Sequence, residues 1–358
     1  MLKEIKIADK TIGKNGPCFI IAEAGVNHNG SLELAKKLVD AAKDSGADAV
    51  KFQSFNANSL QFKTTKKPHY QNRCIGDDEK TGYYDMIKKL EMSKEDQIKI
   101  ADYCKEKDIM FLSTPYDDES ADFLDKVVKV PAFKLASIEL NNHLFIRYIA
   151  KKQKPIILST GLSDIEDVRT VVEIAKKEGF VDRLILLQCT SDYPAKPEDI
   201  NLNVIKTYMK KFPEVLFGLS DHSETCTASI GAVAIGAVVL EKHFTLNKKF
   251  KGPDHSSSLN KKELNEWVKC VREIEALMGS YDKNITRSEE RNKTMRKYIV
   301  MMPQKAGAVI EENMLKAMRT GNGILPIEKN LKKIIGKKLN KDIEEITPLS
   351  WGMIKNKS

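Results

Sequence analysis

Short apolar runs alternate with longer amphipathic segments along most of the chain. The runs are roughly five to eight residues long, and the segments between them repeat apolar residues at helical spacing. This alternation is typical of β/α units. It predicts eight strands, at residues 18–24, 49–55, 109–114, 132–137, 155–160, 183–190, 214–220 and 237–244.

The amphipathic segments predict the helices. They cover residues 31–45, 94–107, 117–128, 143–153, 164–178, 202–211, 225–236 and 261–278. Ser31 and Ser93 precede two of them as cap residues, with acidic residues in the first turn. Eight β/α units over about 260 residues favour an α/β fold of the closed (β/α)8 TIM barrel type over an open doubly wound sheet. The first strand is not followed by Gly-x-Gly-x-x-Gly, which also counts against a dinucleotide-binding fold.

Two stretches interrupt the alternation. The polar residues 56–85 form a long connection after the second strand, which we interpret as a lid or substrate loop. The barrel is expected to occupy residues 1–280, followed by a charged linker at 281–294. Residues 295–358 contain Gly and Pro turns and predict a small β-rich module.

Composition excludes several classes of protein. Hydrophobic residues make up 41% of the chain and charged residues 30%, which suits a globular fold with a core rather than a disordered chain. No apolar stretch is long enough to cross a membrane, and the acidic N-terminal residues do not fit a secretory signal. We therefore expect a cytoplasmic protein without a membrane partner. The six cysteines include no C-x-x-C pair and are expected to be free thiols.

The net charge of +9 is concentrated at the C-terminal end. Residues 281–358 hold 17 Lys and Arg against 9 Asp and Glu, an excess of 8. The lysines there are dispersed, and no nucleic-acid-binding motif is present. This pattern favours a solvated surface, or attraction for a small anionic substrate, over nucleic-acid binding.

Polar residues stand at the ends of all eight predicted strands, where a barrel carries its active site. Lys51 and Lys134 are flanked by apolar strand residues, so each must bury its stem and find an anion. With the hydroxyls nearby, they indicate a pocket for phosphate and carboxylate groups. His222 and His243 end neighbouring strands and can aim both imidazoles at one divalent metal ion. Two histidines without a third strong ligand indicate an exchangeable site suited to manganese or magnesium.

The other four histidines are less informative. His28 lies in the first β/α loop and could orient a substrate. His69, His143 and His255 are interpreted as surface or loop residues.

Eight ordered motifs resemble the N-acetylneuraminate (sialic acid) synthase family, and with the tail motif the resemblance extends over nearly the whole chain. They are Ile-Ala-Glu-Ala-Gly-Val-Asn-His-Asn-Gly (21–30), Val-Lys-Phe-Gln-Ser-Phe (50–55), Leu-Ser-Thr-Pro-Tyr (112–116), Phe-Lys-Leu-Ala-Ser-Ile-Glu-Leu-Asn-Asn (133–142), Ile-Leu-Ser-Thr-Gly (157–161), Gln-Cys-Thr-Ser-Asp-Tyr-Pro (188–194), Gly-Leu-Ser-Asp-His (218–222) and Glu-Lys-His-Phe-Thr (241–245). The tail motif Met-Arg-Thr-Gly-Asn-Gly-Ile (318–324) resembles the antifreeze-like (SAF) domain of that family.

The resemblance implies a transferase that condenses phosphoenolpyruvate (PEP) with the aldehyde of an N-acetylated hexosamine and water. The products would be a nine-carbon 2-keto sugar acid and phosphate, formed by C–O cleavage. It implies PEP binding by Lys51, Thr114, Lys134, Ser137, Ser159 and Ser220, and binding of a divalent metal by His222 and His243. Manganese is the first expectation for that metal, with magnesium or cobalt as alternatives. Glu23, Gln53, Glu139, Tyr193 and Asp254 would face the reacting atoms or the sugar, with Glu23 or Glu139 handling the proton.

The resemblance also implies a homodimer with a swapped C-terminal domain, in which Arg319 of one protomer touches the sugar bound by the other. Two positions depart from the family pattern. Arg319-Thr320-Gly321 stands where the family commonly has Arg-Pro-Gly, and Gln188 stands where many members have His. We expect Gln188 to face the substrate and to influence sugar preference.

Two other functions are compatible with parts of the pattern. A metal-dependent aldolase or isomerase on a TIM barrel would use the histidines and Glu23 but would not need two lysines on strands. A non-catalytic carbohydrate-binding protein would not need polar groups at every strand end. The sequence leaves open whether the sugar is N-acetylmannosamine, its 6-phosphate or a 2,4-diacetamido-6-deoxy relative.

Overall fold

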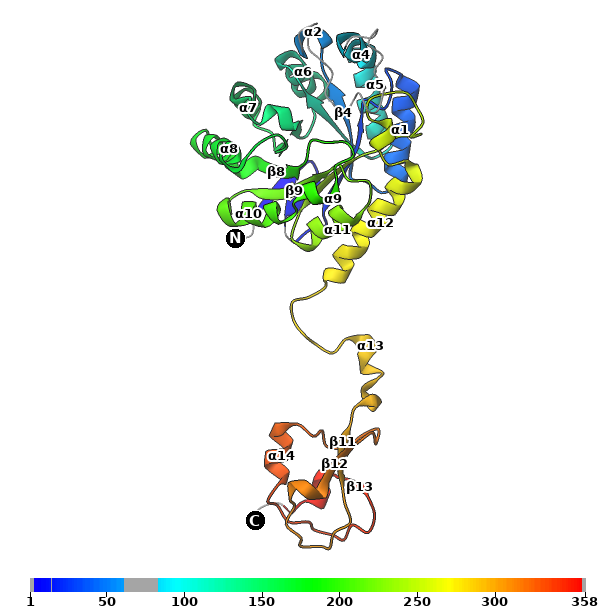
Figure 1. Cartoon of the computed structure of the whole chain (residues 1–358), viewed down its shortest axis with the longest axis vertical. Coiled ribbons are helices and arrows are strands. Elements are labelled where there is room, and N and C mark those ends of the chain that lie inside the picture. Colours follow the sequence, from blue (N-terminus) through cyan, green and yellow to red (C-terminus); the bar gives the residue numbers. More distant parts are fainter. Residues whose placement is uncertain (1–2, 14, 61–82, 356–358) are drawn as a thin grey trace. The chain divides into compact units, whose positions relative to one another are not determined.

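The computed structural model describes residues 3–13, 15–60 and 83–355 (Figure 1). The chain divides into two compact units, Met1–Gly279 and Ser280–Ser358. Most of the connection that we interpreted as a lid, residues 61–82, lies outside the described residues. In the described part, no helix is both long enough and apolar enough to cross a membrane.

The first unit is a (β/α)8 barrel, as the sequence predicts. Its strands are β3 (Phe19–Gly25), β4 (Ala49–Ser54), β5 (Met110–Pro115), β6 (Phe133–Leu135), β7 (Ile156–Ser159), β8 (Leu184–Cys189), β9 (Leu216–Asp221) and β10 (Val239–His243). They pair in parallel in the order β5-β4-β3-β10-β9-β8-β7-β6, and β5 and β6 lie side by side to complete the ring.

Helices follow the strands and surround the barrel (Figure 1). They are α1 (Leu32–Asp44), α2 (Ala57–Leu60), α4 (Tyr83–Leu90), α5 (Lys94–Glu106), α6 (Asp118–Phe123), α7 (His143–Ala150), α8 (Ile165–Lys177), α9 (Pro197–Ile200), α10 (Asn203–Lys211), α11 (Thr227–Ala234) and α12 (Lys261–Met278). Ser31 and Ser93 accept backbone N–H groups at the starts of α1 and α5, as their positions in the sequence suggest. The helix α4 was not expected, because we interpreted residues 56–85 as a loop.

Side chains alternate across each strand between the barrel interior and the helices. Near the amino ends of the strands, the interior is filled by apolar residues such as Phe19, Ile157 and Val239. The outward positions, such as Ile20 and Leu240, pack against the helices in a second and larger core. Towards the carboxyl ends the inward positions become polar, and so do the last outward positions of β4, β5, β8, β9 and β10. This change confines the charged groups to one end of the barrel.

An N-terminal hairpin covers the amino end of the barrel. Its strands are β1 (Glu4–Ile7) and β2 (Lys10–Gly13), which pair antiparallel. Ile5, Ile7 and Ile12 join the same buried cluster as the interior residues of the barrel strands. The hairpin was not predicted, and it leaves the carboxyl end as the face through which a substrate can enter.

The second unit is small and β-rich, as expected. Its sheet contains β11 (Tyr298–Met301), β12 (Leu315–Met318) and β13 (Thr347–Pro348), with β11 in the centre and antiparallel to both neighbours. A separate apolar core and the helix α14 (Glu328–Ile334) complete it. The expected linker contains a short helix, α13 (Arg287–Glu290).

Candidate functional site

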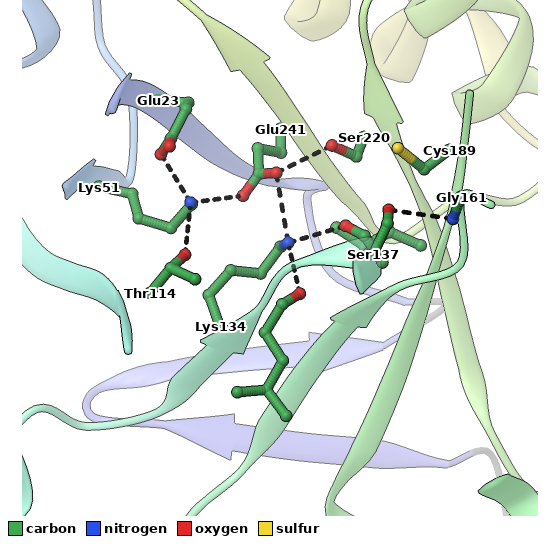
Figure 2. Close-up of polar contacts among 12 residues, drawn as sticks. Glu23, Lys51, Thr114, Lys134, Ser137, Gly161, Cys189, Ser220 and Glu241 are labelled. Atoms are coloured by element: carbon green, nitrogen blue, oxygen red, sulfur yellow. Dashed lines mark hydrogen bonds and ion pairs between the residues drawn. The ribbon is translucent and has the colours of Figure 1, made fainter. Parts of the chain in front are cut away.

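Lys51 and Lys134 lie inside the barrel and are joined through the carboxylate of Glu241 (Figure 2). Glu241 Oε2 is 3.5 Å from Lys51 Nζ, and its Oε1 is 3.4 Å from Lys134 Nζ. Lys51 Nζ also lies 2.7 Å from Glu23 Oε2. All four side chains are at most 4% exposed, so the ion pairs are largely removed from water.

Hydroxyl groups from further strands complete this interior network. Lys51 Nζ donates to Thr114 Oγ1 at 2.9 Å, and Lys134 Nζ donates to Ser159 Oγ at 2.7 Å. Ser220 Oγ donates at 2.8 Å to the carboxylate that joins the two lysines. Seven of the eight strands therefore contribute a side chain to one buried polar cluster. Five of the six residues that the resemblance assigns to PEP binding, all but Ser137, are thus brought together by the fold.

The two carboxyl groups of the network differ in their protonation. Burial raises the pKa of Glu23 to about 7, and the ammonium of Lys51 opposes this shift only in part. Burial acts in the same direction on Glu241, but Lys134 and Lys51 outweigh it and lower the pKa of Glu241 to about 2. Burial lowers the pKa of Lys134, whereas the two carboxylates that face Lys51 raise its pKa despite burial. Near neutral pH, Glu23 can therefore exchange a proton while Glu241 stays ionised.

Ser137 contacts the loop that follows β7. Gly161 N donates to Ser137 Oγ at 3.0 Å. A Cβ on Gly161 would lie 2.8 Å from Ser137 Oγ and closer still to Ser191 Oγ, so only glycine lets this backbone approach the hydroxyls. Cys189 faces the interior at the end of β8, with its Sγ 3.7 Å from His222 Nδ1.

The two histidines that end β9 and β10 lie side by side. The ring centroids of His222 and His243 are 5.4 Å apart. The ring of Tyr193 contacts both imidazoles, with its centroid 4.0 Å from that of His222 and 5.4 Å from that of His243. His222 Nδ1 donates to the backbone oxygen of Thr190 at 2.7 Å, which fixes the ring orientation, and its Nε2 lies 3.4 Å from Ser220 Oγ.

The donor set of this histidine pair fits a divalent cation. His243 Nδ1 is buried and makes no hydrogen bond to any described residue, and Asp254 Oδ2 lies 3.7 Å from it. Burial and the nearby His222 hold the pKa of His243 well below its usual value, so its ring is neutral and can act as a ligand. Within residues 3–13, 15–60 and 83–355, no cluster of three or more His, Cys, Asp or Glu side chains has the geometry of a metal site. Water or substrate would have to supply the remaining ligands.

Gly25 creates a recess between three polar side chains. It has φ +54° and sits at an irregularity in the pairing of β3 with β4. A Cβ at this position would lie 3.3 Å from Glu23 Oε1, 3.4 Å from Gln53 Nε2 and 3.6 Å from Asp254 Oδ2. Gln53 Nε2 also donates to Glu23 Oε1 at 3.3 Å. The missing side chain leaves room beside a carboxyl, an amide and a second carboxyl.

Two residues of the expected site make no hydrogen bond or ion pair to this cluster in the described part of the chain. Glu139 is buried at the end of the turn that begins at Ser137, and its Oε2 accepts a hydrogen bond from Asn142 Nδ2 at 2.8 Å. Burial raises the pKa of Glu139. Arg319 follows β12 in the second unit and is exposed.

The expectation that Gln188 faces the substrate is wrong. Gln188 follows the inward-facing Leu187 on β8 and points outward, where its Nε2 donates to Ile200 O at 3.2 Å. His255 lies in the loop region after β10, but the interpretation of it as a surface residue is wrong. This side chain is fully buried, with Nδ1 2.7 Å from Thr245 Oγ1 and Nε2 3.1 Å from Asn29 Oδ1.

Glu241 is the main site residue that the sequence analysis missed. It was visible at the end of the eighth strand, in Glu-Lys-His. Two inward neighbours on the same strand, Val239 and His243, show by period two that Glu241 also faces the interior. Applying that alternation to each strand would have identified it.

Comparisons with known proteins agree on one family. The profile of the NeuB family matches residues 38–283. The chain is 39% identical over 352 residues to N,N'-diacetyllegionaminic acid synthase of Legionella pneumophila, covering 96% of each chain. It is 35% identical over 353 residues to human N-acetylneuraminate-9-phosphate synthase, covering 96% of this chain and 95% of the human one. The crystal structure of the N-acetylneuraminic acid (sialic acid) synthetase from Leptospira borgpetersenii is also similar, with a TM-score of 0.70 and 32% identity over 82% of this chain and 95% of that chain.

Proposed function

This chain belongs to the NeuB family, whose members condense PEP with amino sugars, and we propose that its own acceptor is an N-acetylated hexosamine in the open-chain aldehyde form. C3 of PEP would form a bond to the aldehyde carbon, and water would add to C2. The bond between C2 and the bridging oxygen would then break and release phosphate. The first relative described above makes a diacetylated acid, which favours a 2,4-diacetamido-6-deoxy sugar as the acceptor over N-acetylmannosamine or its 6-phosphate.

The observation that carries this proposal is the pair of buried ammonium groups in the interior network. Lys51 and Lys134 share the carboxylate of Glu241, and Lys51 also faces Glu23. Because the pKa of Glu23 is raised to about 7, Glu23 can lose its negative charge by protonation, which leaves the pocket able to take up more negative charge. PEP brings a phosphate and a carboxylate, and Thr114, Ser159 and Ser220 can donate hydrogen bonds to their oxygens. An aldolase or isomerase acting on a neutral sugar would not require two such cations.

We assign the metal ligands to His222 and His243. A divalent cation between the two imidazoles, with manganese as our first choice, would act as a Lewis acid towards the aldehyde oxygen. Tyr193 and the carbonyl of Thr190 hold the His222 ring in place for this role. Asp254 lies beside His243 and next to the recess at Gly25, which suits contact with a sugar hydroxyl.

Glu23 is our choice for the proton-transfer group. The attacking water must lose a proton and the aldehyde oxygen must gain one, so a carboxyl that titrates near neutral pH serves both steps. Burial gives Glu23 that property, and Gln53 orients it. Glu139 contacts Asn142 instead, which supports a role in holding the start of α7.

We also propose that the second unit of a partner protomer covers the barrel mouth in a swapped homodimer. Three large apolar side chains, Ile138, Leu144 and Leu162, are 57%, 81% and 73% exposed in the segments that follow β6 and β7. Met318, which precedes Arg319 in the second unit, is 46% exposed. Exposed apolar groups of this kind favour a covered surface, and reactive intermediates need exclusion of water. We expect Arg319→Ala mainly to weaken sugar binding and to leave PEP binding nearly intact. Mixing Arg319→Ala with His243→Ala protomers should regenerate one intact site per heterodimer if Arg319 acts in trans.

Phosphate release from PEP tests the proposed function directly. We expect release that depends on a 2,4-diacetamido-6-deoxy sugar, with N-acetylmannosamine and its 6-phosphate as comparison substrates. PEP labelled with ¹⁸O at the bridging oxygen should pass its label to phosphate if the C–O bond breaks. Label retained in the sugar acid would contradict this mechanism, and the absence of release with any of the three sugars would contradict the assignment of the acceptor.

A further inference from the structure

A second buried ion pair lies on the outer face of the two strands that carry the histidines. Asp221 on β9 and Lys242 on β10 are register partners and point away from the barrel interior. Lys242 Nζ lies 3.0 Å from Asp221 Oδ2. The two residues are only 1% and 2% exposed, so the pair is desolvated like the network inside the barrel.

Two serines provide the other hydrogen bonds of this ion pair. Asp221 Oδ1 accepts the backbone N–H of Ser223 at 2.9 Å and its Oγ–H at 2.6 Å. Asp221 Oδ2 accepts from Ser229 Oγ, on α11, at 2.5 Å. Lys242 Nζ donates to Ser223 O at 2.7 Å. The four residues Asp221, Ser223, Ser229 and Lys242 form a closed network, which we call the outer clamp.

Burying the charges of the outer clamp costs desolvation free energy that apolar side chains at the same positions would not cost. The neighbouring outward positions on the same strands, Leu219 and Leu240, are apolar and pack against the helices without any polar group. Replacing a buried ion pair by apolar residues of similar volume is often neutral or stabilising. Stability alone therefore does not explain why charges occupy these two positions. A polar network differs from apolar packing chiefly in fixing distances and directions between the groups that it joins.

The outer clamp links the chain around His222 to the chain next to His243. His222 stands between Asp221 and Ser223, which are hydrogen-bonded to each other. His243 directly follows Lys242, whose ammonium binds both of those residues. Because strand residues alternate, each histidine projects into the barrel next to a clamp residue that projects out.

We propose that Asp221 and Lys242 are positioning residues that set the spacing and direction of the His222 and His243 imidazoles for binding a divalent cation. This inference rests on the proposed metal role of the two histidines. The clamp acts through the backbone and contacts neither the cation nor the substrates. Its loss should therefore weaken metal binding and leave PEP binding unchanged.

The test is the affinity of the full-length protein for Mn²⁺, measured by electron paramagnetic resonance of free and bound Mn²⁺. In the double variant Asp221→Leu/Lys242→Met, both charges are removed together, so no buried charge remains unpaired. We expect a melting temperature equal to or above that of the wild type, with Mn²⁺ bound at least about tenfold more weakly. PEP binding by calorimetry should stay within about twofold. Mn²⁺ affinity that falls less than tenfold in this folded variant would overturn the inference.

Control variants separate this outcome from others. Ser54→Ala/Gln97→Leu removes a buried hydrogen bond of 2.6 Å on the outer face of β4, away from the histidines, and should leave Mn²⁺ affinity unchanged. His222→Ala should abolish Mn²⁺ binding. If it does not, the proposed metal site itself fails, which differs from failure of the clamp.

A milder variant covers the case in which the double variant does not fold. Ser229→Ala removes one hydroxyl from the clamp at a site on α11. We expect it to weaken Mn²⁺ binding at least about threefold, with PEP binding unchanged. A smaller loss of Mn²⁺ affinity would overturn the inference without the double variant.

Discussion

Two buried ion-pair networks share the strands β9 and β10, one on each face. Inside the barrel, Glu241 is divided between two ammonium groups at 3.4 and 3.5 Å, and His243 Nδ1 makes no hydrogen bond to a described residue. Outside, Asp221 and Lys242 are 3.0 Å apart, and their other hydrogen bonds, of 2.5 to 3.4 Å, all stay within the clamp.

The difference separates two uses of buried charge. A closed network such as the outer clamp holds the strands in one arrangement and has nothing left to offer a ligand. The interior network has two ion pairs of 3.4 and 3.5 Å beside its shorter contacts. It also contains a carboxyl that titrates near pH 7 and lies near a neutral imidazole, and these groups can gain partners when substrates arrive. Removing charge inside should therefore affect the reaction. Removing one charge outside should destabilise the fold, whereas removing both together should change the placement of the histidines without destabilising it.

The largest effect is expected for Lys134→Met. This variant removes one of the two cations that we assign to PEP, while Glu241 keeps its ion pair with Lys51 and its bond from Ser220. We expect kcat/KM for PEP to fall about 1000-fold, with a modest change in melting temperature. Steady-state phosphate release and calorimetry measure the two quantities. Activity within tenfold of the wild type would show that the interior network is structural.

The matching single variant on the outer face is Lys242→Met. It leaves Asp221 buried with two serine partners and no counter-charge. We expect it to reduce the free energy of unfolding by about 3 kcal/mol, because an uncompensated buried charge remains. Urea denaturation measures this loss. If Lys134→Met destabilised the protein more than Lys242→Met does, the contrast between the two networks would disappear.

Two buried histidines in the loops at the barrel mouth, His28 and His255, belong to neither network and predict a pH dependence of stability. Burial lowers the pKa of His28 and that of His255 to about 4, so the unfolded chain binds more protons than the folded one below pH 6.5. Their contribution to stability is present above pH 6.5 and is lost as the pH falls towards 4. For His28, which is 1% exposed, we expect a loss of about 2 kcal/mol between pH 6.5 and 5. Urea denaturation of wild type and His28→Gln across this range should show a shallower dependence in the variant; identical slopes would contradict the assignment.

The smallest effect concerns the recess at Gly25. Gly25→Ala would place a methyl group near Glu23, Gln53 and Asp254. We expect about a tenfold rise in KM for the sugar, with KM for PEP unchanged. Gly46→Ala is the matched control, since Gly46 also has positive φ (+80°) but has only Val268 nearby. Both variants should lose about 1 kcal/mol of stability from backbone strain, so an equal effect on the sugar KM would reject the recess as a substrate site.

Alternation along the strands accounts for what could be predicted from the sequence. The β/α rhythm predicts the barrel, and the carboxyl ends of strands locate Lys51, Lys134, His222 and His243. To predict which face of a strand a residue lies on, one must count in steps of two from a residue known to face inward. That count was not made for Glu241, and it would have shown that Gln188 points outward.

Other features depend on contacts between distant parts of the chain. The N-terminal hairpin has strands of four residues each, too short for a clear pattern, and it is stabilised by packing against barrel strands as distant in the sequence as β10. His255 is buried because the loop after β10 meets Asn29 in the first β/α loop. No local signal in the sequence indicates that meeting. The outer clamp likewise appears only when β9 and β10 are in register.

The central claim is that the interior network is open to ligands and the outer clamp is closed. A crystal structure with Mn²⁺ and PEP, using anomalous scattering at the manganese edge, tests both halves at once. The account predicts a manganese peak between the imidazoles of His222 and His243, PEP oxygens beside Lys51 and Lys134, and an unchanged distance between Lys242 Nζ and Asp221 Oδ2. Manganese or PEP bound elsewhere, or a rearranged Asp221–Lys242 pair, would contradict it.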